Sequence, residues 1–253
     1  MNQVALYTLT TREVKRFVRL WRQTLIPPMI TALLYLIVFG SVIGQRVGQV
    51  QGVDYIVFVL PGLAMLTMVL ASFQNSVSSF YIEKYNQSLD ELLVAPMSHF
   101  DIILGFIFGG ILRGLLTGFL IVLLGKLFLH ITIMHIGYMI VAMALVCFTF
   151  ACLGMLNAMY AKKFDDITTI PDFILTPLIF FGGVFYDGSN LKGPMLWLHT
   201  VNPISYYIDL FRYSLLGTGE FDHYIVLAFT VCMAAISFTV LYVLFNRGYG
   251  VKY

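Results

Sequence analysis

Residues 102–126 read IILGFIFGGILRGLLTGFLIVLLGK. The only charged residues in this run are Arg113 and Lys126, and it exceeds the about 20 apolar residues that a helix needs to cross a bilayer. Glycines recur four residues apart, at 105 and 109 and again at 110, 114 and 118, so that a neighbouring helix can approach closely. The run therefore predicts a membrane-spanning helix packed against another helix, either of this chain or of a second copy.

The composition of the whole chain agrees with a lipid environment. Of the 253 residues, 59% are hydrophobic and 11% are charged, whereas a soluble domain carries roughly 25% charged residues. The net charge of +2 is too small to indicate nucleic-acid binding. Three cysteines, Cys147, Cys152 and Cys232, lie in apolar runs and are interpreted as packing residues. The histidines are scattered, so no metal site is predicted.

Six apolar runs are long enough to be membrane spans. The predicted fold is therefore all-α and integral to the membrane, with residues 1–253 forming a single transmembrane domain. The predicted spans are residues 25–44, 55–80, 102–126, 136–160, 168–186 and 223–245. Pro171, Pro177 and the pair Gly182–Gly183 interrupt the fifth run, which predicts a broken helix there.

The placement of Lys and Arg residues indicates the orientation. With six spans, both ends of the chain lie on the same side of the membrane. Ten Lys and Arg residues lie in the segments on that side and four on the other, while Arg113 lies within a span. The positive-inside rule therefore predicts that the N and C termini are both cytoplasmic.

Residues 1–24 predict an amphipathic helix in the plane of the cytoplasmic headgroups, where anionic lipid attracts its basic face. Thr10 and Glu13 have the spacing of a capping box near its start. The apolar residues that share one helical face are Val14, Phe17, Val18, Trp21 and Leu25. The helix is interpreted either as a membrane anchor or as a docking surface for a cytosolic partner.

A short, well-delimited helix is predicted at residues 87–98, between the second and third spans. Ser88 and Glu91 have the spacing of a capping box, and Asp90 lies in the first turn, where the helix dipole favours a negative charge. Pro96 disfavours helical geometry at Ala95 and ends the helix.

The leucines of this short helix need a surface to pack against. Leu89, Leu92 and Leu93 share one face, and about two turns of helix are not stable alone in water. A groove on a cytosolic protein is the leading interpretation. The chain's own spans and the lipid are the alternatives.

The outer segment, residues 187–217, is predicted to hold helices that enter the outer leaflet without crossing it. Asn202 is a predicted N-cap, with Pro203 at the first helical position, and the helix that follows ends at Gly217. From Pro203 to Leu216 that helix is about 21 Å long at ~1.5 Å per residue, short of the ~30 Å core. Asp209 and Arg212 are three residues apart and could pair.

A cation in the middle of a span is costly and usually faces protein or water. The candidate partners of Arg113 are Gln74, Asn75, Ser76 and Ser78 of the second span, or Asp172 of the fifth. A role in a substrate pathway and a structural role as a hydrogen-bond hub are both compatible with the sequence. The chain carries no Walker-type nucleotide motif and no catalytic constellation, so an enzymatic activity is not expected.

Four segments match a known family in order and spacing. They read QTLIPPMITALLYLIVFG (23–40), SLDELLVAPMS (88–98), AKKFDDITTIPDFILTPLIFFGGVFY (161–186) and NPISYYIDLFRYSLLG (202–217). Over nearly the whole chain, their arrangement resembles the permease subunit of type-2 ABC exporters, and most closely the YadH-like inner-membrane permeases of Gram-negative bacteria. The chain departs from the family in the outer loop NLKGPMLW, and at Asp209, where many members carry glutamate.

The resemblance implies a permease in the bacterial inner membrane that exports an amphipathic, lipid-linked, polysaccharide or drug-like substrate. Two copies of the permease and two of a cytosolic ABC ATPase would form the working unit, with ATP and Mg held by the ATPase and no cofactor by this chain. Residues 87–98 would be the coupling helix that docks on the ATPase, through Ser88, Leu89, Asp90, Glu91, Leu92, Leu93 and Pro96. The implied outer gate comprises Gly182, Gly183, Asn202, Pro203, Tyr206, Asp209 and Arg212.

Two other classes of function are weighed against an exporter. A secondary transporter driven by an ion gradient is disfavoured because the spans lack mid-membrane carboxylates and the halves show no inverted repeat. A membrane assembly protein without a transport path would use the 87–98 helix to bind a structural partner. No residue identifies the substrate, although the scarcity of intramembrane charge favours an amphipathic or lipid-linked molecule.

Overall fold

The computed structural model describes residues 3–250, so residues 1–2 and 251–253, including Lys252 of the charge count, lie outside the described part. The elements are α1 (Gln3–Arg19), α2 (Trp21–Val38), the π-helix η1 (Phe39–Ile43), α3 (Gly44–Val47), β1 (Gln49–Val50), β2 (Val53–Asp54), α4 (Tyr55–Tyr85), α5 (Ser88–Val94), α6 (His99–Phe128), α7 (Ile136–Tyr160), α8 (Asp166–Ile170), the π-helix η2 (Pro171–Leu175), α9 (Thr176–Phe180), the 3₁₀-helix η3 (Gly188–Asn190), α10 (Pro194–Val201), α11 (Pro203–Leu216) and α12 (His223–Asn246).

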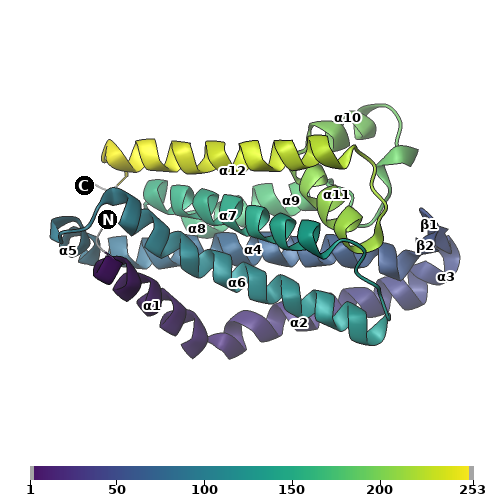
Figure 1. Ribbon diagram of the computed structural model, residues 1–253, viewed down its shortest axis with the longest axis horizontal. Helices are drawn as coiled ribbons and strands as arrows, with labels where there is room; N and C mark the ends of the chain where they lie inside the picture. The colour runs from purple at the N-terminus through teal and green to yellow at the C-terminus, as the bar shows by residue number, and fades with distance from the viewer. Residues whose placement is uncertain (1–2, 251–253) are drawn as a thin grey trace.

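The long helices run side by side along the long axis of the molecule (Figure 1). Within residues 3–250, five helical segments are long and apolar enough to cross a membrane: Trp21–Val47, Tyr55–Tyr85, His99–Phe128, Ile136–Tyr160 and His223–Asn246. They overlap the first four predicted spans and the sixth. The prediction of an all-α membrane protein is confirmed.

The fifth predicted span, residues 168–186, is a shorter, broken helix. It is helical in α8, η2 and α9, of five residues each, and the chain turns after Phe180. The π-helix starts at Pro171, and Pro177 lies at the start of α9. Proline has no backbone N–H to donate, so each proline interrupts the regular hydrogen bonding of the α-helix. From Asp166 to Phe180 the segment is about 22 Å long at ~1.5 Å per residue, less than the ~30 Å hydrocarbon core.

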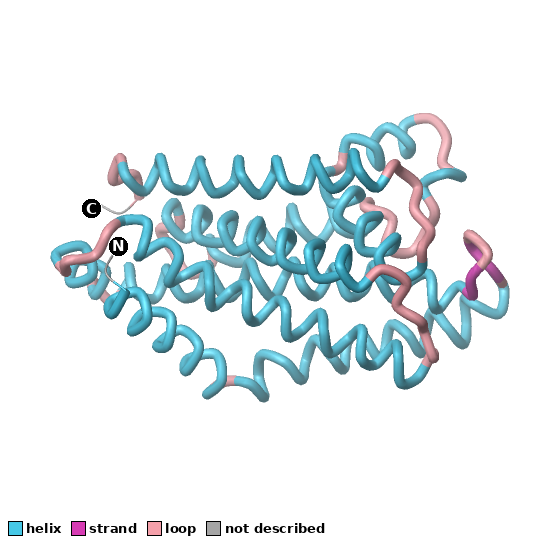
Figure 2. Tube along the Cα trace, viewed as in Figure 1, coloured by secondary structure: helices cyan, strands magenta, loops and turns pink. Residues whose placement is uncertain are grey.

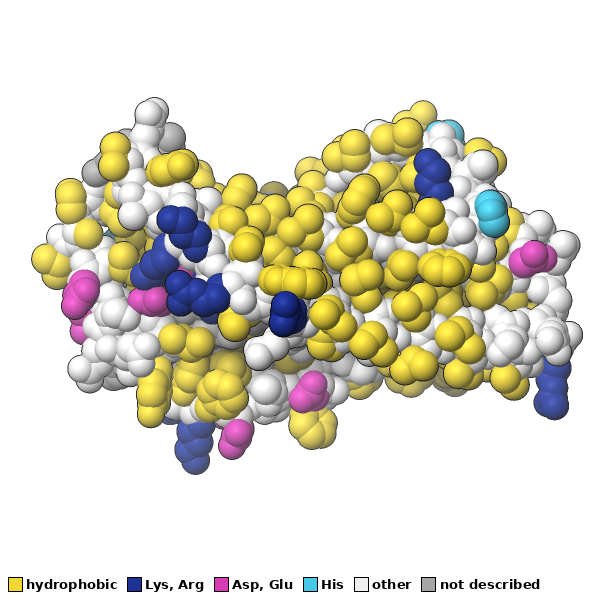
Figure 3. Space-filling model, turned by 90° about the horizontal axis from the view of Figure 1, so that it is seen from below, with side chains coloured by type: hydrophobic (Ala, Val, Ile, Leu, Met, Phe, Trp, Pro, Cys, Tyr) yellow, Lys and Arg dark blue, Asp and Glu magenta, His cyan; other side chains and the backbone are white. Residues whose placement is uncertain are grey.

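The two ends of the bundle differ. α5, the start of α1 and the end of α12 lie at one end, and α10, α11 and the β1–β2 hairpin lie at the other (Figures 1 and 2). We refer to these as the α5 end and the α11 end. On the face seen in Figure 3, Lys and Arg side chains gather towards the α5 end and hydrophobic side chains cover the middle. This arrangement agrees with the predicted placement of the basic segments on one side of the membrane.

The core is built around α4, which packs against α6 and α7. Most of the residues of α4 are buried, whereas only Ala32 and Leu36 are buried in α2. The glycines of α6 face neighbours within this chain: a Cβ at Gly114 would clash with Ser72 of α4, and one at Gly105 with Leu9 of α1. The close approach predicted from glycine spacing is therefore made between helices of the same chain.

Two glycines of α7 allow a direct test of this packing. At Gly154 a Cβ would collide with the Phe73 carbonyl of α4, a backbone atom that cannot move aside, whereas Gly137 has no heavy atom within 4 Å of that position. Gly154→Ala is expected to reduce the free energy of unfolding by about 1–3 kcal/mol through overpacking. Gly137→Ala is expected to leave it unchanged or raise it by up to about 1 kcal/mol, because alanine favours the helix.

Thermal unfolding of both variants in the same detergent checks this prediction. Equal transition temperatures for the two variants would contradict the close contact between α4 and α7.

Candidate functional site

The short helix between the second and third spans is α5 (Ser88–Val94), which lies within the predicted segment 87–98 but ends four residues before its end. Its start is not formed by the predicted capping box of Ser88 and Glu91, however. Gln87 adopts a left-handed conformation (φ 61°) that turns the chain, and the Ser88 hydroxyl donates to Glu83 Oε2 at 2.7 Å. Extended backbone at Ala95, before Pro96, ends the helix as expected.

A capping box does form one helix later, at the start of α6. The Asp101 backbone N–H donates to Ser98 Oγ (3.2 Å), and the Ser98 N–H donates to Asp101 Oδ2 (3.3 Å). The same residue spacing is present in the sequence at both places. At Ser88 a tertiary partner, the carboxylate of Glu83, takes the hydroxyl instead.

The leucine face of α5 packs against this chain and not against a free groove. Leu89 is 2% exposed, and Leu92 and Leu93 are partly buried against the same core. The expectation that these leucines fit into the groove of a partner is therefore wrong for Leu89, which is buried in the core of this chain beside α4, and it stays a prediction for Leu92 and Leu93. Exposed at the α5 end are Asp90, Glu91, Val94 and Pro96. Val94, with 87% of its surface exposed, is the most prominent apolar group among them.

Polar side chains connect α5 to α1. Glu83, which binds Ser88, also pairs with Arg12 of α1 (Nη1 to Oε1, 3.2 Å). One residue along α1, Glu13 is 1% exposed, accepts a hydrogen bond from Ser79 of α4, and pairs with Arg16 at 3.3 Å. The start of α5 is thereby held to α4 and α1 at once.

The buried Glu13 corrects two expectations about the N-terminal helix. Thr10 lies inside α1, so it does not form a capping box with Glu13. The face of α1 that packs on α6 contains Leu9, Glu13 and Phe17, whereas Val18 is 54% exposed. The predicted helix, residues 1–24, is described from Gln3 and ends at Arg19. Glu13 can be buried because its carboxylate pairs with Arg12 and Arg16 and accepts a hydrogen bond from Ser79. The face of α1 that packs on α6 therefore includes Glu13 and not Val18.

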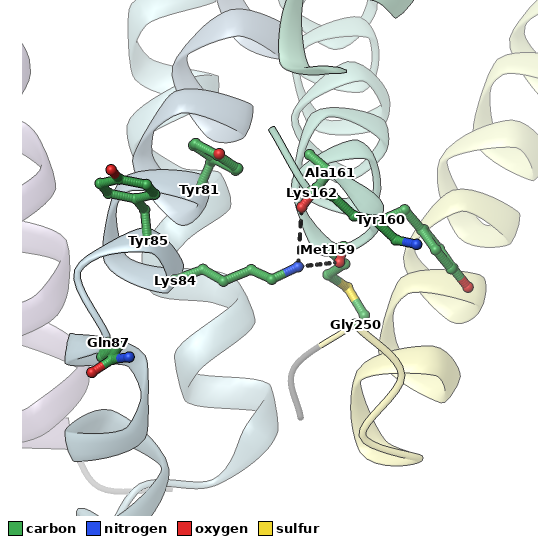
Figure 4. A pocket seen from close by; sticks show the side chains of 9 residues that line it. All are labelled: Tyr81, Lys84, Tyr85, Gln87, Met159, Tyr160, Ala161, Lys162 and Gly250. Carbon is green, nitrogen blue, oxygen red and sulfur yellow. Dashed lines mark hydrogen bonds between the residues drawn. The ribbon is translucent and has the colours of Figure 1, made fainter. Parts of the chain in front are cut away.

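A cavity of about 600 Å³ lies beside α5 (Figure 4). Lys84 extends across it from α4, and its Nζ donates to the carbonyls of Met159 (2.6 Å) and Ala161 (3.3 Å) at the end of α7. Gln87, which precedes α5, and Gly250 line the same cavity. The last turns of α4 and α7 are thus tied together directly next to α5.

Arg113 lies at the middle of α6, and two cavities share it as a lining residue together with Gln74. Of the partners predicted for it, Gln74, Ser78 and Asp172 line one of these cavities. Asn75 and Ser76 face glycines 109 and 110 of α6 instead. The structure therefore brings three of the five predicted partners to a cavity that Arg113 also lines.

At the α11 end, Asn202 and Gly217 delimit α11 as predicted. Asn202 Oδ1 accepts the Ile204 N–H at 3.0 Å, Pro203 follows it, and Gly217 ends the helix with φ 74°. The Asn202 amide also donates to the carbonyl of Leu178 (2.5 Å), which lies in α9. The start of α11 is therefore fixed to the broken helix.

Arg212 is the centre of a buried polar network. It is 1% exposed, donates through Nη2 to the Gly183 carbonyl (2.6 Å) and pairs with Glu220 at 3.3 Å. Glu220 also accepts the Gly188 N–H at 3.0 Å and pairs with His199 at 2.9 Å. The network joins the turn after α9, the loop before α10, α10 itself and α11.

The predicted pairing of Asp209 with Arg212 is wrong. Asp209 instead accepts the backbone N–H groups of Glu220 (2.6 Å) and Phe221 (3.2 Å). This holds the loop after α11 so that the Glu220 side chain reaches Arg212, whose guanidinium also lies 3.9 Å from the Phe58 ring centroid. Asp209 and Arg212 are three positions apart on the helix, but the loop after α11 supplies N–H donors to Asp209 and a carboxylate acceptor to Arg212.

Three further residues shape this end. Gly182 turns the chain after α9, with its N–H donating to Ile179 O at 3.0 Å, and the Tyr206 hydroxyl donates to Thr200 O at 2.8 Å. Asp187 accepts hydrogen bonds from Ser189 and from Gln51 of the hairpin. Burial alone would raise the pKa of Asp187, but these bonds outweigh it and hold the pKa below its usual value.

Comparisons with known proteins add to this geometry. Residues 4–216 match the model of the ABC-2 type transporter family. The inner membrane transport permease YadH of Escherichia coli (strain K12) is 38% identical over 251 residues, which cover 98% of this chain and 97% of that protein. The chain belongs to the ABC-2 type transporter family. The family resemblance inferred from four sequence segments is thereby confirmed, and the chain is an inner-membrane permease component with several membrane-crossing helices.

More distant relatives of this ABC-2 permease carry a different name. Nodulation protein J of Rhizobium meliloti (strain 1021) is 24% identical over 216 residues, covering 85% of this chain and 82% of that protein. Nodulation protein J of Rhizobium leguminosarum bv. trifolii is 26% identical over 191 residues, covering 75% and 73%.

Sequence reasoning missed two members of the network in this permease, Glu220 and His199. His199 is one of the scattered histidines for which the sequence predicts no site, and Glu220 lies outside every apolar run. An acidic residue shortly after a helix containing Arg212, in a chain with 11% charged residues, was the available signal. The contact between them depends on how the loop folds back, which no local pattern encodes.

Proposed function

We propose that this chain is the permease half of an ATP-driven exporter and that a separate cytosolic ATPase docks on α5. The observation that carries the proposal is the surface at the α5 end, where Asp90, Glu91, Val94 and Pro96 are exposed. The opposite face of α5 is fixed to the bundle through the buried Leu89 and the hydrogen bond from Ser88 to Glu83. Val94 gives the exposed surface one apolar group that a docked partner would cover. Two acidic groups beside it favour a partner whose groove carries basic residues.

The hydrogen bonds around α5 support a rigid mechanical connection. Leu89 is inserted into the core, and Ser88 is held through Glu83 to Arg12 of α1. A force applied to α5 would therefore move α1 and the end of α4 with it, and α4 packs along α6 and α7. The chain does no chemistry in this proposal, since ATP and Mg are held by the ATPase subunits.

We assign the α11 end the role of outer gate. α10 and α11 are too short to cross a bilayer and would remain in the outer half of the membrane. In the present conformation the Arg212–Glu220 network holds α9, α10 and α11 together. Opening towards the outside would require these elements to separate, with the hairpin moving together with Asp187 through Gln51.

The working unit contains two permeases and two ATPases in this proposal. α2 offers a face for the second copy or for lipid, because Ile30, Leu34 and Ile37 are each more than half exposed. With the α5 end in the cytoplasm, N and C termini are both cytoplasmic. The substrate belongs to the amphipathic, lipid-linked, polysaccharide or drug-like molecules that such exporters move.

Purification from native membranes in mild detergent tests the proposed function. Mass spectrometry should identify a co-purifying ABC ATPase, and the complex should hydrolyse ATP. Transport that depends on an ion gradient and not on ATP would identify a secondary transporter instead. A stable partner without nucleotide-dependent conformational change would identify a membrane assembly protein.

A further inference from the structure

Arg113 stands in the part of the bundle where charge is least tolerated. It lies near the middle of α6, a helix of 30 residues, so about 21 Å of helix extends on either side at ~1.5 Å per residue. An arginine at that depth is costly unless protein, water or a ligand compensates for its charge. The charge of Arg113 should therefore be compensated either by another residue of this chain or by a molecule that binds beside it.

The described residues do not neutralise this cation. Across residues 3–250, no carboxylate lies within ion-pair distance of the Arg113 guanidinium, and its buried Nε has no hydrogen-bond partner there. The contrast with Arg212 is direct, because that buried arginine has both a carboxylate and a carbonyl. A guanidinium has five N–H donors that suit carboxylate and phosphate oxygens.

The guanidinium borders two cavities, of about 270 and 290 Å³. In the smaller one, between α4, α6 and the α8–η2 segment, Asp172 is also a lining residue. In the larger one, between α2, α4 and α6, Arg113 is the only charged residue among the described residues that line it. Its walls there combine the amides of Gln23 and Gln74 with apolar side chains such as Leu66 and Leu70.

We propose that Arg113 binds the anionic group, a phosphate or a carboxylate, of an amphipathic substrate in the cavity between α2, α4 and α6. The amides of Gln23 and Gln74 add uncharged donors beside the guanidinium, and the apolar walls receive the start of the tail. The prolines of α2, Pro27 and Pro28, line the same cavity and extend its apolar wall. The inference rests on the proposed transport function and names its substrate class.

Binding of a labelled probe tests this inference. The full chain would be placed in nanodiscs of zwitterionic lipid and titrated with radiolabelled dodecyl phosphate. Arg113→Gln is expected to weaken binding by about tenfold or more, because it removes the charge-assisted bonds. Arg113→Lys should stay within about threefold of the native protein, since it keeps the charge but loses the planar fork. Arg22→Gln, which removes an exposed arginine at the start of α2, is the matched control and should leave binding unchanged.

The competitors and a folding control make the result decisive. Thermal unfolding should show Arg113→Gln to be folded, because an uncompensated cation is removed and not created. Equal binding by Arg113→Gln and the native chain would overturn the inference, and so would equal competition by dodecyltrimethylammonium. Inorganic phosphate that competes as well as dodecyl phosphate would show a site for free anions and also overturn it. Co-purification of the ATPase with Arg113→Gln reports separately on the proposed function.

Discussion

Val94→Asp is expected to release the ATPase from this permease, lowering its recovery in co-purification by about tenfold or more. Val94 is 87% exposed at the end of α5, so the substitution disturbs nothing that the permease packs in its own core. An aspartate there would bring a third carboxylate next to Asp90 and Glu91 and would be desolvated in the interface without a partner. Nucleotide hydrolysis stimulated by the permease should fall in parallel.

Two further substitutions serve as controls for Val94→Asp. Val47→Asp changes a half-exposed valine at the α11 end and should leave ATPase recovery at the native level. Leu89→Asp buries a charge in the core, so it should destabilise the permease as well as release the ATPase. If Val94→Asp retains the ATPase while its thermal stability is native, the exposed face of α5 is not the docking surface.

Glu220→Gln is expected to cost about 3–5 kcal/mol of stability, since it leaves the charge of Arg212 buried without its carboxylate. Arg212 is 1% exposed, so water cannot replace the lost partner. The new amide also presents N–H donors where Gly188 and Arg212 already donate. The transition temperature in detergent measures this loss.

Asp222→Asn is the matched control for the outer network. Asp222 is two residues away and caps α12 by accepting the N–H groups of Tyr224 and Ile225, and asparagine caps a helix about as well as aspartate. It should therefore change stability by less than about 0.5 kcal/mol. In a double-mutant cycle, Arg212→Met should recover part of the stability lost in Glu220→Gln, because both charges are then absent. Equal effects of the two acid-to-amide changes, or strict additivity, would contradict the network.

The parts of the fold that follow from local signals could be predicted. Long apolar runs predicted the five long helices, because only a helix satisfies its own backbone in lipid. Asn202, Pro203 and Gly217 predicted the bounds of α11, since capping depends on neighbouring residues. Pro96 predicted the end of α5 for the same reason.

The interactions that depend on tertiary contacts could not be predicted. Ser88 has the spacing of a cap but binds Glu83, and Asp209 has the spacing of a partner for Arg212 but binds the loop. The leucine pattern of α5 showed that one face needs burial without showing which surface covers it. For Leu89 the answer lies in how α4 ends, which is a property of the packed bundle.

Photo-crosslinking from single positions of α5 tests the central claim most directly. A benzophenone amino acid would be placed at position 94, which is exposed, or at position 89, which is buried, and cells would be irradiated before membranes are isolated. The account predicts a crosslink from position 94 to an ABC ATPase and none from position 89. Absence of an ATPase crosslink at position 94, in a permease that is folded and expressed at the native level, would contradict the assignment of α5 as the docking helix.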